Sequence, residues 1–254
     1  EGYFNKKLLL IKEEISEITG IPTGKSSGKV VPHILYCSYM KLIDYSLKDN
    51  KYYLKLTKLG EVVYENDKYL SEKLTHFLLH YNLTLPGDSY AALWAYTFRV
   101  AVANKNLGKS FNQNLLKNLI DNYYQKEANV SPLFLTYSEG YCFYETEFLN
   151  FDDSNKIRIN EAPIGNDYIY LYGYSLINDV DKFIFSSTEI SIDDFINKTG
   201  WNSVFGFSAS RFNSILLLLE SNGIIRLNKQ YSPYTLLPLK KVEELIPKLY
   251  SNLV

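Results

Sequence analysis

The segment Gly24-Lys25-Ser26 holds the residue types of a phosphate-binding loop. Such a loop needs two glycines separated by four residues, after a strand and before a helix. Here Gly20 and Gly24 are separated by three residues, Pro22 lies between them, and the preceding segment is predicted to be helical. We therefore expect neither nucleotide hydrolysis nor a bound cofactor, and predict a turn at the entrance of a helix instead.

That turn can still meet an anion, because small residues let backbone N–H groups approach a phosphate and lysines add positive charge. The predicted contacts at this helix entrance are Lys25, Ser26, Ser27 and Lys29. A plain solvated loop is the alternative interpretation of the same residues.

Two histidines and several carboxylate pairs offer other chemistry, but none has the expected partners. His76 and His80 have the spacing of two zinc ligands on a helix, yet the glutamate of a metalloprotease motif is missing and no third ligand is evident. A pair in the core or on the surface is the simpler interpretation. Adjacent carboxylates such as Asp193-Asp194 do not face each other on a helix. We find no catalytic constellation, expect no metal site, and predict that the chain is not an enzyme.

Composition and charge indicate an ordinary globular chain with a basic beginning. Of 254 residues, 46% are hydrophobic and 22% are charged, which argues against wholesale disorder. Residues 1–60 carry 10 basic and 6 acidic side chains, a net charge of +4, whereas the remainder carries a net charge of −5. A local anionic partner is therefore expected at the N-terminal end. The 23 tyrosines and 14 phenylalanines could stack on single-stranded bases, but most lie at positions typical of a core.

The location of the protein follows from what the chain lacks. No apolar stretch approaches the roughly 20 residues of a membrane span. Cys37 and Cys142 have no companion spacing for a disulfide framework, which fits a reducing compartment. We expect a cytoplasmic protein with no membrane partner. Because the chain begins at Glu1 rather than Met, an upstream segment is also expected.

Hydrophobic periodicity predicts two helices near the beginning of the chain. The first covers residues 7–15. After a glycine-rich break, the second begins between Gly28 and Pro32 and ends near Lys41. Val31 and Ile34 are expected on its buried face, and His33 and Tyr36 on the opposite face.

Two apolar runs, 43–47 and 52–56, surround the polar turn 48–51 and predict a β-hairpin. Thr57 is expected to cap another helix. Helix, turn, helix and two-stranded wing is the order of a winged helix-turn-helix, in which the second helix enters the major groove.

The middle of the chain is predicted to be helical over 69–81, 89–104, 112–125 (with Ser110 as its N-cap) and 167–181. Residues 131–165 are irregular, with a short hairpin expected in the aromatic run 141–148.

The end of the chain repeats the architecture of its beginning. Ser191 and Ser208 are expected to cap two helices, and Gly223 to follow the second one with a positive φ. The runs 224–227 and 234–237 predict a second wing, and a final helix is expected over 240–250. The side of the longer helix that carries Arg211, Ser214 and Leu218 should pack against the middle of the chain or against a partner.

Several short motifs, in this order, resemble a bacterial family of unknown function, number four thousand and seven. They are Phe4-Asn5-Lys6-Lys7, the run from Gly20 to Val30, Leu56-Thr57-Lys58-Leu59-Gly60, Leu78-Leu79-His80-Tyr81 and Ser131-Pro132-Leu133. The resemblance implies a helical, DNA-associated accessory protein encoded in phage-defence and DNA-modification clusters, including phosphorothioation islands. The family's usual upstream His-Glu-Thr-Phe-like segment is not present in this sequence.

Together these patterns predict a mainly α fold with small β wings. The expected domains are an N-terminal winged helix-turn-helix (1–67), a helical middle with a short β segment (68–187) and a C-terminal winged-helix-like domain (188–254).

The expected function is DNA binding without catalysis. The helix entrance at 25–29, His33 and Tyr36 on the second helix, and Lys48 and Lys51 at the wing tip should contact duplex DNA. Another protein of the same gene cluster is the second expected partner. The alternatives are a protein–protein adaptor that uses its winged helices as scaffold, and an enzyme with an unrecognised site among the middle helices.

Overall fold

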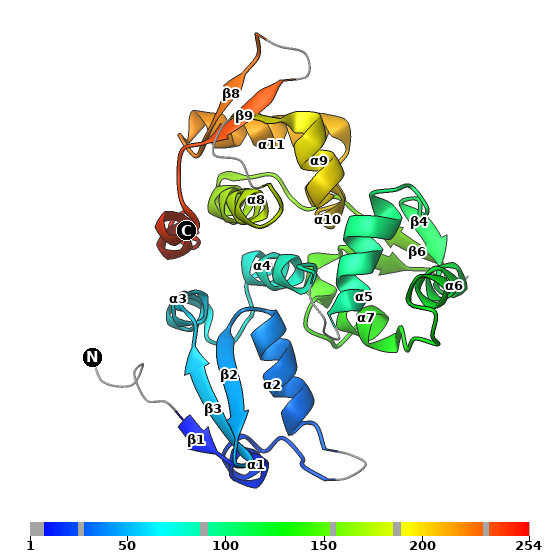
Figure 1. Ribbon diagram of the computed structural model, residues 1–254, viewed down its shortest axis with the longest axis vertical. Coiled ribbons are helices and arrows are strands. Elements are labelled where there is room, and N and C mark those ends of the chain that lie inside the picture. Colours follow the sequence, from blue (N-terminus) through cyan, green and yellow to red (C-terminus); the bar gives the residue numbers. More distant parts are fainter. Residues whose placement is uncertain are drawn as a thin grey trace. The chain divides into compact units, whose positions relative to one another are not determined.

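The computed structural model describes residues 8–24, 28–86, 91–152, 156–184, 189–230 and 234–253. Within those ranges the protein is mainly helical with three small antiparallel sheets, as the sequence predicts (Figure 1). The chain divides into two compact units, Glu1–Ser71 and Glu72–Val254. The finer predicted domain boundaries stay predictions. None of the described helices combines the length and apolar character that crossing a membrane needs.

In its described residues, the first unit contains three helices and one sheet in the strand order β1-β3-β2. Its elements are β1 (Leu8–Leu10), α1 (Lys12–Thr19), α2 (Val30–Tyr39), β2 (Ile43–Lys48), β3 (Lys51–Leu56) and α3 (Lys58–Asp67). The predicted hairpin is confirmed. Its two turn residues, Asp49 and Asn50, both have positive φ (51° and 59°), the left-handed pair that matches the twist of a tight hairpin.

Two expectations for the first unit are wrong. Residues 8–10 form a strand rather than part of a helix, because Leu8 and Leu10 pair with Leu54 and Tyr52 of β3. Three consecutive leucines are compatible with both a helix and a strand, and pairing with β3 favours the strand. On α2 the buried residues are Val30 and Ile34, whereas Val31 is 36% exposed. The first unit's core is small and contacts only the face of α2 that carries Val30 and Ile34. Val31 follows Val30 in sequence and therefore points away from that face.

The core of the first unit joins α1, α2 and the sheet through Ile15, Val30, Ile34 and Tyr52. Thr57 and Gly60 then connect α3 to the end of α2. The Thr57 hydroxyl accepts a hydrogen bond from the Gly60 N–H at 2.9 Å and donates to the carbonyl of Lys41. A Cβ at position 60 would lie 1.9 Å from the carbonyl oxygen of Leu42, so only glycine permits this approach. The Leu56–Gly60 motif is thus explained by packing.

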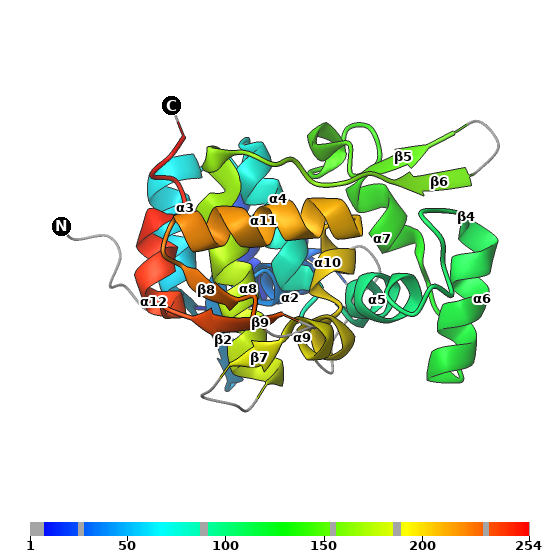
Figure 2. The same cartoon turned by 90° about the horizontal axis from the view of Figure 1, so that it is seen from above.

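The second unit contains the remaining elements. Its first half holds α4 (Lys73–Leu83), α5 (Ala92–Trp94), the π-helix η1 (Ala95–Val102), β4 (Ser110–Asn112), α6 (Gln113–Tyr124), α7 (Ser131–Thr136), the 3₁₀ turn η2 (Tyr144–Thr146), β5 (Leu149–Phe151) and β6 (Lys156–Ile159). Strands β4, β6 and β5 form one sheet in that order (Figure 2).

Its second half begins at a 3₁₀ turn and ends at another. The elements are η3 (Asn166–Tyr168), α8 (Ile169–Phe183), β7 (Ile190–Ser191), α9 (Ile192–Thr199), α10 (Trp201–Val204), α11 (Ala209–Ser221), β8 (Ile225–Asn228), β9 (Thr235–Pro238), α12 (Val242–Leu245) and η4 (Ile246–Lys248). Strands β7, β9 and β8 form a third sheet, and α11 packs across α8 (Figure 2).

Three expectations for the second unit need correction. The hairpin lies at 149–159 rather than within 141–148, because Phe143 and Phe148 are buried in the core and leave strand pairing to the residues after them. Helix α6 is capped by Asn112, whose side chain accepts the Leu115 N–H at 2.7 Å, since Ser110 belongs to β4. The last helix is shorter than 240–250 and continues as the 3₁₀ turn η4, which includes Pro247.

Several local predictions near the end of the chain are confirmed. Ser191 and Ser208 cap α9 and α11, and Gly223 has a φ of 63°. The second hairpin is present as β8 and β9. Helix α11 packs on α8, and its buried residues are Phe212, Ile215, Leu216 and Leu219. The expected packing of the opposite side is not confirmed as a whole, because Arg211 forms an ion pair with Glu161 at 3.2 Å but Ser214 is exposed.

The core of the second unit gathers aromatic rings around His80, which is 1% exposed. Its Nε2 lies 2.7 Å from the carbonyl oxygen of Val204, which can only accept, so Nε2 carries the proton and donates it. Its Nδ1 accepts from the hydroxyl of Tyr137. His76 is also buried, which confirms the core interpretation of the pair. Burial lowers the pKa of His80 to about 4.

This shift predicts a loss of stability in mild acid. The unfolded chain, with its histidine near pKa 6.5, binds the proton before the folded chain does. Keeping His80 neutral therefore contributes to the free energy of unfolding above pH 6.5, and this contribution is lost as pH falls toward 4. The free energy of unfolding should fall by about 2 kcal/mol between pH 7 and pH 5 for this reason. Urea denaturation at both pH values should show a smaller decrease for His80→Gln than for the wild type. The same decrease in both proteins would contradict the assignment.

Candidate functional site

The beginning of α2 and the turn of the β2–β3 hairpin lie at the same end of the first unit (Figure 1). This follows from the chain path, because only residues 40–42 join α2 to β2 and the two elements run in opposite directions. Lys29 therefore lies at the end of α2 nearest to the turn that Lys48 and Lys51 flank. At a helix N-terminus the backbone dipole also favours anions.

All three lysines are exposed. The ion pairs of the first unit, within the residues the structure describes, are Lys12–Glu13 and Lys58–Glu61, so Lys29, Lys48 and Lys51 have no acidic partner there. Asp49 adds one carboxylate in the turn itself. The predicted contacts Lys25, Ser26 and Ser27 lie outside the described residues.

His33 and Tyr36 lie one turn apart on α2. His33 is exposed, and its Nδ1 lies 2.7 Å from the carbonyl oxygen of Lys29, which ties the ring to the beginning of the helix. Tyr36 is half-buried and contacts Tyr39 edge to face with ring centroids 6.0 Å apart. The structure thus places His33 on the open surface beside Lys29 and leaves Tyr36 only partly available.

The second unit contains a buried ion pair between Arg99 of η1 and Asp179 of α8. The closer contact is 2.6 Å, and the side chains are 6% and 0% exposed. The guanidinium also donates to the carbonyl oxygens of Thr84 and Thr199, at 2.8 and 2.7 Å. Burial acts to lower the pKa of Arg99, but Asp179 outweighs it and raises that pKa, so the guanidinium stays charged. Tyr81 donates a further hydrogen bond to Asp179 at 2.6 Å.

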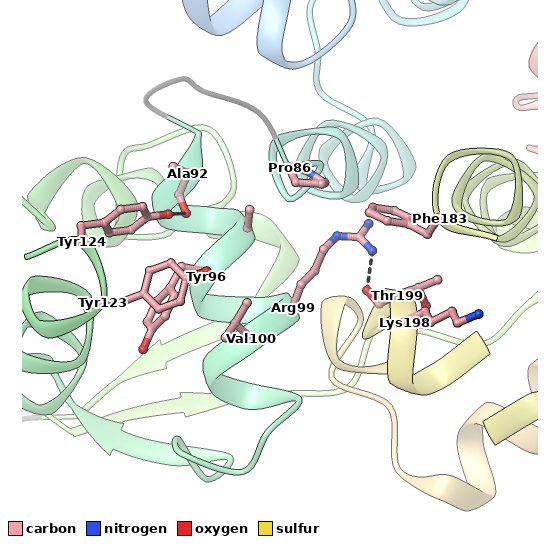
Figure 3. A pocket seen from close by; sticks show the side chains of 11 residues that line it. Pro86, Ala92, Tyr96, Arg99, Val100, Tyr123, Tyr124, Phe183, Lys198 and Thr199 are labelled. Carbon is pink, nitrogen blue, oxygen red and sulfur yellow. Dashed lines mark hydrogen bonds between the residues drawn. The ribbon is translucent and has the colours of Figure 1, made fainter. Parts of the chain in front are cut away.

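A pocket of about 240 Å³ opens beside this ion pair. Figure 3 shows Tyr96 and Tyr123 on one side of Arg99 and Phe183 on the other. The lining residues come from η1, α6, α8, α9 and the neighbouring segments, namely Pro86, Ala92, Ala95, Tyr96, Arg99, Val100, Tyr123, Tyr124, Phe183, Lys198 and Thr199.

Sequence reasoning missed this pocket and its ion pair. Arg99 and Asp179 are 80 residues apart, and no local pattern joins them. A signal was available, because Arg99 is a lone charge in the very apolar segment 89–104 and Asp179 lies in the apolar part of α8. Charged residues are almost never buried unless they are paired, so each predicts a partner elsewhere in the chain. Within the described ranges, no three His, Cys, Asp or Glu side chains are grouped as metal ligands would be.

The family comparison agrees with the resemblance seen in the sequence. The model of a family described as "Protein of unknown function (DUF4007)" matches residues 33–135. This confirms the expected domain family over that stretch, which covers most of α2, the hairpin, α3 and the first part of the second unit. No curated protein matches the chain.

Solved structures of a protein named SspB share the fold. One, described as the SspB crystal structure, has a TM-score of 0.70 at 13% identity and covers 94% of this chain and 79% of its own. Another, the magnesium ion-bound SspB crystal structure, has a TM-score of 0.68 at 13% identity and covers 88% and 75%. The chain is therefore similar in fold to SspB.

Removing one member of the buried pair should be costly. Arg99→Met leaves a buried, unpaired carboxylate, and Asp179→Leu leaves a buried guanidinium, so each should lower the free energy of unfolding by about 3–5 kcal/mol. Arg99→Met with Asp179→Leu should cost less than the sum of the two, as urea denaturation would measure. Arg211→Met, at the more exposed pair with Glu161, should cost less than about 1 kcal/mol. Strictly additive costs would contradict a coupled pair.

Proposed function

We propose that this chain is a non-catalytic DNA-binding accessory protein whose first unit is a winged helix that contacts duplex DNA. Helix α2 is the element that would enter the major groove, and the β2–β3 hairpin is the wing. The observation that carries the proposal is the position of three exposed lysines, Lys29, Lys48 and Lys51, at one end of the unit without acidic partners among the described residues.

The size and order of the elements support this assignment. Helix α2 has 10 residues, which at 1.5 Å per residue makes it about 15 Å long, comparable to the roughly 12 Å width of the major groove. Lysines at its beginning and at the wing tip would reach the phosphates on either side. Lys25, Ser26 and Ser27 precede the same helix in sequence and would add to this contact.

Binding of this kind depends on phosphates more than on bases. The exposed face of α2 offers His33 but no Arg, Asn or Gln, the side chains best suited to paired hydrogen bonds with base edges. We therefore propose little sequence discrimination by the first unit alone.

We also propose a cellular role in phage defence or DNA modification, on the basis of the family resemblance. The resemblance links such proteins to phage-defence and DNA-modification gene clusters, and the family model that matches residues 33–135 is that of the same family. We further propose a protein partner from the same cluster. Large apolar side chains near the end of the chain support it, since Leu217, Tyr234 and Leu239 are 50%, 50% and 41% exposed.

The contribution of the lysines can be measured from the salt dependence of binding. Each lysine that neutralises a phosphate contributes about 0.9 to the slope of log affinity against log salt. Lys29→Ala with Lys51→Ala should therefore reduce that slope by roughly two units, and weaken duplex binding about 10- to 100-fold near 0.1 M salt. Fluorescence anisotropy titrations of duplexes with unrelated sequences, between about 50 and 200 mM salt, would measure both quantities.

A matched control removes the same charge from the second unit. Lys105→Ala with Lys126→Ala changes two exposed lysines there and should leave the slope unchanged. Equal slopes for the wild type and the Lys29/Lys51 variant would show that this end of the first unit does not contact DNA. Absence of duplex binding at low salt, together with stable co-purification of a cluster protein, would favour the adaptor instead.

A further inference from the structure

We infer that the pocket beside Arg99 binds one nucleotide unit, with the base against the aromatic wall and the phosphate toward Lys198. Four of the pocket's lining residues are aromatic: Tyr96, Tyr123, Tyr124 and Phe183. Aromatic walls of this kind accept flat rings by stacking, whatever the identity of the base. The inference concerns the second unit and does not depend on duplex binding by the first.

The charge of the pocket favours an anionic ligand. Arg99 and Lys198 are the charged members of the described lining, and none of those lining residues is acidic. Arg99 is neutralised by Asp179 and acts as part of the wall. Lys198 is exposed and takes part in no ion pair within the described part of the chain, so it is available to a phosphate. Lys198 also offsets the negative end of α9, a stabilising role that ligand titration can separate from binding.

The size of the pocket limits the ligand to a single ring system. Its volume of about 240 Å³ is below the roughly 300–1,000 Å³ of pockets that enclose drug-sized molecules. A base fits this description, with its sugar and phosphate projecting to the surface. Tyr123 is 58% exposed, and its ring centroid lies 4.5 Å from that of Tyr96, which is only 5% exposed. Tyr123 therefore supplies the open aromatic face, and Tyr96 supports it from below.

The backbone beneath the pocket is unusual in a way that points to function. Ala95, Tyr96, Arg99 and Val100 all come from the π-helix η1, and such helices are rare and occur frequently at functional sites. Tyr96 and Val100 of this helix line the pocket, and Arg99 also reaches Thr84, Asp179 and Thr199. Burial raises the pKa of Tyr96, so its phenol remains neutral beside a phosphate.

Titration of the full chain with a nucleoside monophosphate, followed by NMR or calorimetry, tests this inference. Tyr123→Ala removes the stacking face and should weaken binding of both adenosine monophosphate and adenosine about 5- to 100-fold. Lys198→Ala should weaken the monophosphate about 10-fold and leave adenosine unchanged. Both positions are exposed, so neither variant is expected to disturb the fold.

Matched controls are Tyr141→Ala, at a tyrosine that is 52% exposed, and Lys105→Ala, both outside the pocket and both expected to bind as the wild type does. The Lys29/Lys51 variant should also bind the monophosphate normally, which separates this inference from duplex binding. Titration with a short single-stranded oligonucleotide distinguishes a nucleic-acid strand from a free nucleotide as the ligand. Tighter binding of the oligonucleotide supports a strand as ligand, and equal binding supports a free nucleotide. No binding at millimolar monophosphate, or wild-type affinity in both pocket variants, would overturn the inference.

Discussion

The second unit depends on the buried ion pair between Arg99 and Asp179. A guanidinium removed from water must have its charge and its donors satisfied, and here one side chain contacts a carboxylate and two backbone carbonyls. Those partners belong to α8, to the residue that follows α4 and to the last residue of α9. These contacts fix the position of the π-helix relative to α4, α8 and α9. They also fix the wall of the pocket, because residues of the π-helix line it.

Close backbone approach completes this arrangement. Gly200, with a φ of 60°, lets the turn between α9 and α10 meet η1, since a Cβ there would lie 2.9 Å from the carbonyl oxygen of Arg99. The same turn holds the Thr199 carbonyl where the guanidinium can donate to it. In the first unit, Gly60 and Thr57 have a similar role between α3 and the end of α2. In each unit a glycine permits the approach and a hydrogen bond fixes it.

Features with a local cause could be predicted from the sequence. The caps Thr57, Ser191 and Ser208 bond to amides three residues away, and Gly223 relieves backbone strain at its own position. Features set by distant partners could not. The strand at 8–10 depends on β3, the hairpin at 149–159 depends on β4, and the pocket depends on helices far apart in sequence. Of the predicted DNA contacts, Lys29, Lys48 and Lys51 are at one end of the first unit. The hairpin register explains the placement of Lys48 and Lys51, and the short connection from α2 to β2 explains that of Lys29.

That register has a consequence for the hairpin itself. Lys48 and Lys51 are directly opposite each other across the two strands, and like charges in such a pair repel. The Asp49 carboxylate in the turn offsets part of this repulsion, and an anion near both ammonium groups would offset more of it. A phosphate between the two ammonium groups would replace repulsion with attraction, so hairpin stability and anion binding at its tip would be thermodynamically linked. Added salt should therefore have two opposite effects. It screens the repulsion between Lys48 and Lys51 in the free hairpin, and it also screens their attraction to a polyanion.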